Sequence, residues 1–258
     1  MFNSLWSKWS LSRVRRQLAA NLTVFLSLLV VGVNGAHAQP IKVAVASNFL
    51  STAELLKEYF SATTQIEVEL IAASTGKLYA QIVNGAPYDV FMAADTAHPL
   101  QLIEAGVAKS KRVHVFAVGQ LMLWTRDGLA LEDIWQTKPT RVAIANPKLA
   151  PFGAAARSVM IDRQVWEAWA ETTVQGENIN QTLQFALSGS VDLAFLSMSQ
   201  ASALTNVGVV YPLTLANAKV LHQAAVALSD SPTGQLFVNF LSTDEARLII
   251  AEQGYELP

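Results

Sequence analysis

The stretch that decides the fold is Ala72–Leu78, with the sequence Ala-Ala-Ser-Thr-Gly-Lys-Leu, which follows the apolar run Ile66–Ile71. It predicts a strand that ends in a small-residue turn, followed at once by a helix. Ser74 and Thr75 are residue types that cap helices, and Gly76 allows a close approach of the backbone. Such a turn presents N–H groups and hydroxyls at the positive end of a helix, which favours an anion. One turn alone is weak evidence, because most Ser-Thr-Gly turns only cap a helix.

Three other strand ends carry the same kind of break. They are Ser47-Asn48 after Ile41–Ala46, Phe152-Gly153 after Arg141–Ala145, and Asn178-Ile179 after Thr172–Val174. Strands and helices that alternate with short connections predict an α/β fold with parallel sheets. Ligands of such sheets bind at the carboxyl ends of the strands. Two breaks fall in each half of the chain, so two facing lobes would bring four helix N-termini to one cleft.

The remaining elements follow from apolar periodicity and turn residues. Further strands are expected at Tyr88–Ala93, Val113–Val118, Leu121–Trp124, Val191–Leu196, Val209–Tyr211 and Ala224–Leu228, and helices at Phe49–Phe60, Gly153–Trp169, Ile179–Leu187, Pro232–Phe240 and Asp244–Gln253. Two prolines predict that Asn146–Gly153 is a loop. Asn178 with Gln181 three residues later resembles a capping box, and Gly189 is expected to end the helix that it starts.

Residues 1–38 have the pattern of a secretory signal peptide. Four basic residues without an acid precede the apolar run Leu18–Val33 and the small-residue site Ala36-His37-Ala38. This order predicts cleavage before Gln39 and export to the periplasm. The alternative is a transmembrane anchor, which is less favoured because Asn21, Thr23 and Ser27 interrupt the run.

Composition excludes several classes of partner. Removal of residues 1–38 leaves 14 lysines and arginines against 20 acidic residues, a net charge near −6. Such a balance argues against nucleic acid and against an anionic membrane surface. The chain has no cysteine, so disulfides and thiolate metal sites are excluded. At 52% hydrophobic residues it can bury a substantial core.

The four breaks offer hydroxyls and backbone N–H groups but no carboxylate. A small, fully deprotonated oxyanion would be satisfied by such donors. A protonated anion such as hydrogenphosphate would bury its own O–H without an acceptor, which is costly. The cation nearest to a break, Lys77, is interpreted as an exposed, solvated side chain.

The sequence also resembles the periplasmic molybdate-binding proteins of ABC transporters, which have the type II solute-binding fold. The resemblance covers residues 41–258 and is carried by motifs spread over the chain. These are Ala46–Leu50, Ser74–Ile82, Asn84–Phe91, Ala94-Asp95, Asn146-Pro147 through Ala150–Gly153, and Gly254-Tyr255. It implies an α/β fold of two lobes, residues 39–117 plus 220–258 and residues 118–219, with the ligand cleft between them and two crossing strands as their link.

The resemblance also implies the ligand set, position by position. The oxyanion would be held through Ser47, Thr75 and the backbone N–H groups of Phe152 and Ile179, with Asn48 and Ser74 beside them. Some members have a ligand tyrosine where this chain has Ser197, which we keep as a candidate. The implied ligand is molybdate or tungstate, without a cofactor or a resident metal. The implied partner is a membrane permease, and we expect a monomer.

Two other functions remain as alternatives. The same fold could bind sulfate, thiosulfate or another small anion, because donor type does not separate tetrahedral dianions. Ser74-Thr75-Gly76-Lys77 is also an S-x-x-K string, as in penicillin-binding acyl-transfer enzymes. That function needs a Lys-Thr-Gly triplet, for which the chain offers only Pro232-Thr233-Gly234. His98, His114 and His222 have no metal-ligand spacing, so we expect a binding protein rather than an enzyme.

Overall fold

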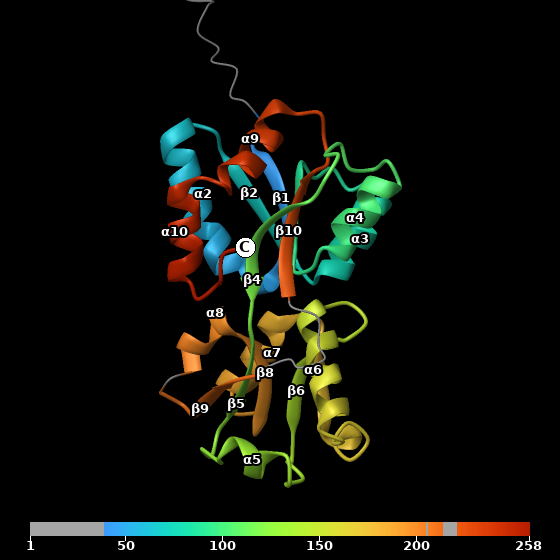
Figure 1. Cartoon of the computed structure of the whole chain (residues 1–258), viewed down its shortest axis with the longest axis vertical. Coiled ribbons are helices and arrows are strands. Elements are labelled where there is room, and N and C mark those ends of the chain that lie inside the picture. The colour runs from blue at the N-terminus through green and yellow to red at the C-terminus, as the bar shows by residue number, and fades with distance from the viewer. Residues whose placement is uncertain (1–38, 205, 214–220) are drawn as a thin grey trace, which may run out of the picture. The chain divides into compact units, whose positions relative to one another are not determined.

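The computed structural model describes residues 39–204, 206–213 and 221–258 (Figure 1). The predicted signal peptide, residues 1–38, lies outside the described residues. In the part described, the chain forms two five-stranded sheets with helices packed around each. None of the helices there is both long enough and apolar enough to cross a membrane.

The first sheet has the strand order β2-β1-β3-β10-β4. Its strands are β1 (Ile41–Ala46), β2 (Val68–Ala73), β3 (Val90–Ala93), β4 (His114–Gly119) and β10 (Leu221–Ala227). Its helical elements are the 3₁₀ turn η1 (Ser47–Phe49), α2 (Leu50–Thr64), α3 (Thr75–Val83), α4 (Ala97–Glu104), α9 (Pro232–Phe240) and α10 (Asp244–Glu252). Figure 1 shows α2 and α10 on one side of this sheet and α3 and α4 on the other.

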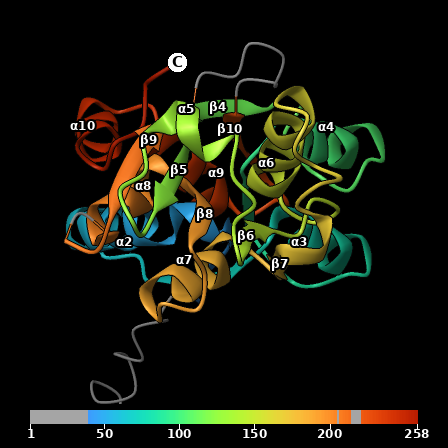
Figure 2. The same ribbon diagram turned by 90° about the horizontal axis from the view of Figure 1, so that it is seen from below.

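The second sheet has the order β7-β6-β8-β5-β9. Its strands are β5 (Leu121–Thr125), β6 (Val142–Ala145), β7 (Thr173–Gly176), β8 (Leu193–Ser197) and β9 (Val209–Pro212). Its helical elements are α5 (Leu131–Ile134), α6 (Pro151–Asp162), η2 (Ala170–Thr172), α7 (Ile179–Leu187), α8 (Met198–Ala201) and η3 (Ser202–Leu204). Seen from below, α6 and α7 lie around β6 and β8 (Figure 2).

Both sheets are mixed, so the prediction of parallel sheets holds for β1 with β2 and β3 and for β6 with β7 and β8, and is wrong for the other pairs. The strand β10 runs antiparallel to β3 and β4, and β5 runs antiparallel to β8 and β9. The physical reason lies in the connections. The chain passes straight from β4 in one sheet to β5 in the other through Gln120 alone, so β5 begins beside Ser197, the last residue of β8, and runs against that strand. The second predicted crossing segment includes residues 214–220, which lie outside the described residues.

Each sheet has its own apolar core, as expected for two large buried sheets. Phe49, Phe60 and Phe237 belong to the cluster around the first sheet, and all are at most 1% exposed. Phe152 and Trp169 belong to the cluster around the second sheet. Burial of large aromatic side chains contributes roughly 1.5–3 kcal/mol each, so both halves have a strong hydrophobic drive to fold.

The largest error in element bounds concerns α6. It was predicted from Gly153 to Trp169 but runs from Pro151 to Asp162. Pro151 is the first helical residue, a position that proline favours because no backbone N–H is needed there. The helix ends just before Gln164, which has a positive φ of 60°. The expectation that a proline lies outside a helix therefore holds for Pro147, and it fails for Pro151, which begins the helix.

Candidate anion-binding site

The four predicted breaks meet around one small space. It is lined by Ala46, Ser47, Asn48, Ser74, Thr75, Ala94, Ala150, Pro151, Phe152 and Ile179. Its volume of about 10 Å³ is roughly what a single water molecule needs. The lining comes from η1 and α3 beside the first sheet and from α6 and α7 beside the second. Six of the seven predicted site residues are therefore brought together, and only Ser197 is not among the lining residues.

Ser74 occupies the N-cap position of α3 without acting as a cap. Its side chain makes no capping hydrogen bond, so that part of the prediction is wrong. Its Oγ is buried and has no hydrogen-bond partner among the described residues. A buried hydroxyl without a partner costs roughly 1–3 kcal/mol. An oxyanion in the adjoining space would supply the missing acceptor, so Ser74 fits such a ligand.

The side chain of Thr75 is held in place by a hydrogen bond within the protein. Its Oγ1 accepts a hydrogen bond of 3.1 Å from the backbone N–H of Ala94, at the end of β3. Because this bond uses the oxygen as an acceptor, the hydroxyl hydrogen remains available to donate. Thr75 is 1% exposed, so that donor lies in a region with little competing water.

The N-terminus of α7 leaves one backbone donor for a ligand. Asn178 Oδ1 accepts from the N–H groups of Asn180 at 3.0 Å and Gln181 at 3.1 Å. In return Gln181 Oε1 accepts from Glu177 N–H at 2.7 Å, one residue before the cap, so the predicted capping box forms with its second bond shifted by one residue. In the first turn only Ile179 N–H is left without an acceptor within the described part of the chain. The cap thus leaves the Ile179 N–H available to donate to a ligand in the adjoining space.

The N-terminus of α6 works in a similar way. Pro151 has no N–H, so Phe152 supplies the first backbone donor of the helix. The Phe152 side chain is 1% exposed and belongs to the second core cluster. Gly153 allows the helix to pack this closely, since a Cβ there would lie 2.1 Å from Ala145 O at the end of β6. The core therefore fixes the position of the Phe152 N–H.

Asn48 lines the space, but its amide hydrogens are already used. Its Nδ2 donates to Gln223 Oε1 at 2.9 Å and to Tyr255 OH at 3.2 Å. The donor that Asn48 retains for an anion is its backbone N–H. Ser197, at the end of β8, is fully buried and its Oγ lies 2.9 Å from Ser199 Oγ. The sequence did not predict that Ser199, Gln223 and Tyr255 contact Asn48, because no pattern of neighbouring residues indicates contacts between distant segments.

No carboxylate lines the space. The acid nearest to it in sequence, Asp95, accepts from His98 N–H at 3.0 Å and lies 2.8 Å from His98 Nδ1. Lys77 is exposed and pairs with Glu177 at 3.3 Å, as expected for a solvated lysine. The positive potential at the site thus comes from helix N-termini and hydroxyl dipoles rather than from ionised side chains. In the described ranges no cluster of three or more histidines or acids could hold a metal ion.

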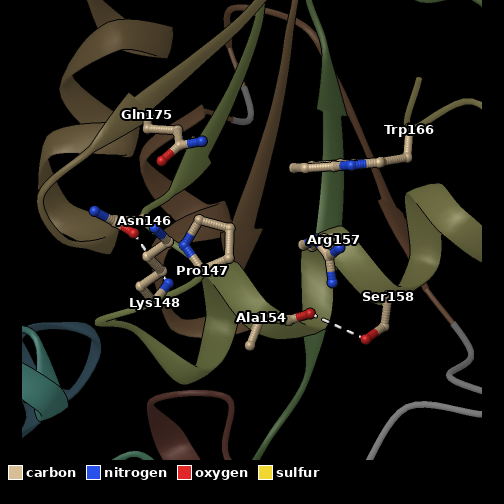
Figure 3. A pocket seen from close by; sticks show the side chains of 8 residues that line it. All are labelled: Asn146, Pro147, Lys148, Ala154, Arg157, Ser158, Trp166 and Gln175. Carbon is tan, nitrogen blue, oxygen red and sulfur yellow. Dashed lines mark hydrogen bonds between the residues drawn. The ribbon is translucent and has the colours of Figure 1, made fainter. Parts of the chain in front are cut away.

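A larger hollow of about 450 Å³ lies on the second-sheet side, next to the loop that begins at Asn146 (Figure 3). The guanidinium of Arg157 lines this hollow and lies over the Trp166 ring, with its central carbon 5.0 Å from the ring centroid. Lys148 and Arg157 are both exposed. Exposed cations bind anions weakly because water screens them. The small space with buried donors is therefore the better candidate for an anion.

Two sheets, a lining shared by helices from both, and a site of hydroxyls and backbone N–H groups without a carboxylate define the class of an anion-binding solute receptor. Residues 41–256 match the family model for bacterial extracellular solute-binding proteins, and the chain belongs to this family.

The relatives narrow the class further. The molybdate-binding protein ModA of Rhodobacter capsulatus is 34% identical over 226 residues, which cover 85% of this chain and 89% of that protein. ModA of Azotobacter vinelandii is 33% identical, covering 90% and 98%. The solved periplasmic molybdate-binding protein of Azotobacter vinelandii superimposes with a TM-score of 0.79 at 30% identity, over 84% of this chain and 99% of that one. The family resemblance inferred from the motifs is therefore confirmed.

Proposed function

We propose that this chain is the solute-binding protein of an ABC transporter, which captures molybdate and delivers it to a membrane permease. The observation that carries the proposal is the small space where four helix N-termini meet buried hydroxyls without any carboxylate. The relatives named as molybdate-binding proteins, at 33–34% identity, support the same ligand. The anion is a transported ligand and not a cofactor.

The donor set fits a bare tetrahedral dianion. Ser47, Ser74 and Thr75 offer hydroxyl hydrogens, and Phe152 and Ile179 offer backbone N–H groups, all at positions that line the space. Molybdate accepts from every direction and has no hydrogen of its own to place. Hydrogenphosphate would bring an O–H to a site without a carboxylate acceptor, at a cost of roughly 1–3 kcal/mol. We therefore propose selection against phosphate by the missing acceptor.

We further propose that capture couples to closure of two lobes, residues 39–117 plus 220–258 and residues 118–219. Ser47, Ser74 and Thr75 come from the first and Phe152 and Ile179 from the second, so one anion accepts from both. Such bridging favours the closed state by the difference in ligand affinity between the two states. The permease would recognise this closed state. We propose that the exported protein acts in the periplasm as a monomer, after removal of residues 1–38.

The chain is a binding protein and not an enzyme, as its relatives are. The geometry of the S-x-x-K string agrees with this. Lys77 Nζ is exposed and paired with Glu177, whereas an acyl-transfer enzyme would use this amine to activate Ser74. Within the described residues Ser74 Oγ has no base as a hydrogen-bond partner.

Calorimetry on residues 39–258 with molybdate, tungstate, sulfate and phosphate tests the proposal. We expect strong binding of molybdate, comparable binding of tungstate, and no binding of phosphate. Tungstate belongs to the proposal because it is also a tetrahedral dianion without a proton. Phosphate binding of similar strength would contradict the donor-only argument. A clear preference for sulfate or thiosulfate would leave the fold intact and replace the ligand.

A further inference from the structure

A buried polar cluster adjoins the anion site through Asn48. We call it the Tyr255 cluster, and its five members come from four separate segments of the chain. They are Asn48 of η1, Ser197 of β8, Ser199 of α8, Gln223 of β10 and Tyr255 of the C-terminal tail. The donor list of the anion site does not account for these contacts, because apart from Asn48 none of them lines the space.

Tyr255 is the centre of this cluster. Its hydroxyl donates to Asn48 O at 2.8 Å, lies 3.2 Å from Asn48 Nδ2, and lies 2.9 Å from Ser199 Oγ. Its ring packs against Phe49 with centroids 4.9 Å apart. At 5% exposed, the residue makes these bonds away from water. The ring thus belongs to the first core, and the hydroxyl holds the turn that leads into α2.

One assignment of the hydrogens satisfies every contact of the cluster except that between Ser199 Oγ and Asn48 O at 3.2 Å, because Ser199 has a single hydrogen. Tyr255 has one hydrogen, and it goes to Asn48 O, which has none of its own. Asn48 Nδ2 and Ser199 Oγ then donate to the Tyr255 oxygen. Ser197 Oγ donates in turn to Ser199 Oγ at 2.9 Å, and the other amide hydrogen of Asn48 goes to Gln223 Oε1. Asn48 is therefore held through both its backbone and its side chain.

The cluster also joins the two halves of the site. Asn48 and Tyr255 lie beside the first sheet, whereas Ser199 follows β8 of the second. Ser199 Oγ contacts both Tyr255 OH and, at 3.2 Å, Asn48 O. These bonds cross between the halves at a point other than the anion. They connect directly to the turn whose neighbour, Ser47, lines the anion space.

We propose that Tyr255 is a positioning residue for anion capture: its hydroxyl holds the Ser47–Phe49 turn in place and binds Ser199 as the halves close. This inference rests on the proposed function. Burial raises the pKa of Tyr255 to about 12, so the hydroxyl keeps its hydrogen at neutral pH. The predicted consequence is slower opening and therefore slower release of the anion.

The test uses Tyr255→Phe, which removes the hydroxyl and keeps the ring against Phe49. We expect molybdate affinity to fall about fivefold to tenfold, mostly through faster dissociation, as for one lost hydrogen bond. Ser199→Ala should give a similar loss. In the double variant the loss should be smaller than the sum of the two single losses, because both changes remove the contact between Tyr255 and Ser199. Tyr211→Phe is the matched control, since its hydroxyl donates to Leu129 O at an exposed position.

A purely structural role for Tyr255 would give a different pattern. The thermal midpoint of the ligand-free protein would fall, while affinity and dissociation rate would stay as in the wild type, and this outcome overturns the inference. Additive losses for Tyr255→Phe and Ser199→Ala would also overturn it. If Tyr255→Phe does not fold, Ser199→Ala alone decides, because Ser199 lies outside both apolar cores. Wild-type protein that binds no molybdate would refute the proposed function itself.

Discussion

Two neighbouring hydroxyls, Ser74 and Thr75, have different duties in the site. Both are at most 3% exposed and both line the anion space. Thr75 Oγ1 accepts from Ala94 N–H, whereas Ser74 Oγ has no partner in the described chain. Thr75 therefore contributes to the folded structure as well as to the ligand. Ser74 contributes mainly to the ligand.

Alanine substitutions should separate these duties. We expect Ser74→Ala to weaken molybdate binding by about 1–3 kcal/mol without lowering the free energy of unfolding, since no bond within the protein is lost. Thr75→Ala should weaken binding by a similar amount and also destabilise the protein by about 1–3 kcal/mol, because Ala94 N–H loses its acceptor. Calorimetry and denaturant unfolding measure the two quantities. Ser158→Ala, outside the space, is the control, and equal destabilisation by both variants would contradict the assignment.

At the scale of elements, the start of α3 touches the loop before α6. Gly76 N–H donates to Leu149 O at 2.8 Å, a bond between segments that belong to different sheets. A Cβ at Gly76 would lie 3.0 Å from Leu149 O and 3.2 Å from Leu149 Cα. Glycine at this position therefore permits the two segments to approach closely, as the sequence suggested for Gly76.

Gly76→Ala should have opposite effects on the stability of helix α3 and on molybdate affinity. Alanine favours a helix over glycine by about 1 kcal/mol, so in the open state, where the two segments separate, the protein should be at least as stable as the wild type. The added methyl group should push Leu149 away and weaken molybdate binding. Affinity by calorimetry and the thermal midpoint test this together. Unchanged affinity would mean that the Gly76–Leu149 contact does not matter for capture.

At the scale of the whole molecule, stability depends on pH through Tyr255. Burial raises the pKa of this hydroxyl from 10.0 to about 12 in the folded protein. Between these values the unfolded chain loses the proton and the folded chain keeps it, so the free energy of unfolding falls as pH rises. Below pH 10 the contribution is fully present.

We expect the wild type to lose stability between about pH 10 and pH 12 more steeply than Tyr255→Phe, which has no hydroxyl to ionise. Denaturant unfolding at a series of pH values would measure the difference. The comparison between the two proteins cancels the titration of lysines that both share. Parallel curves would show that Tyr255 ionises normally and is not buried as described.

Much of the fold could be predicted where the signal is local. The bounds of α7 and α9 agree with the prediction, because an asparagine cap, a proline at the first turn and Gly189 with a φ of 69° act within a few residues. The direction of β5 and β10 could not be predicted. It depends on pairing with strands far away in the sequence, and hydrophobic periodicity carries no information about such pairing.

The sequence by itself determined the α/β class, the four breaks at strand ends that offer hydroxyls or backbone N–H groups, and the absence of carboxylates among them. These properties depend on residue type and on near neighbours. Only the tertiary structure decided that six of the seven candidates share one space and that Ser197 does not line it. It alone joined Tyr255 to Asn48, which are 207 residues apart. The reason is that such contacts form when separate cores bring distant segments together, and no local preference encodes them.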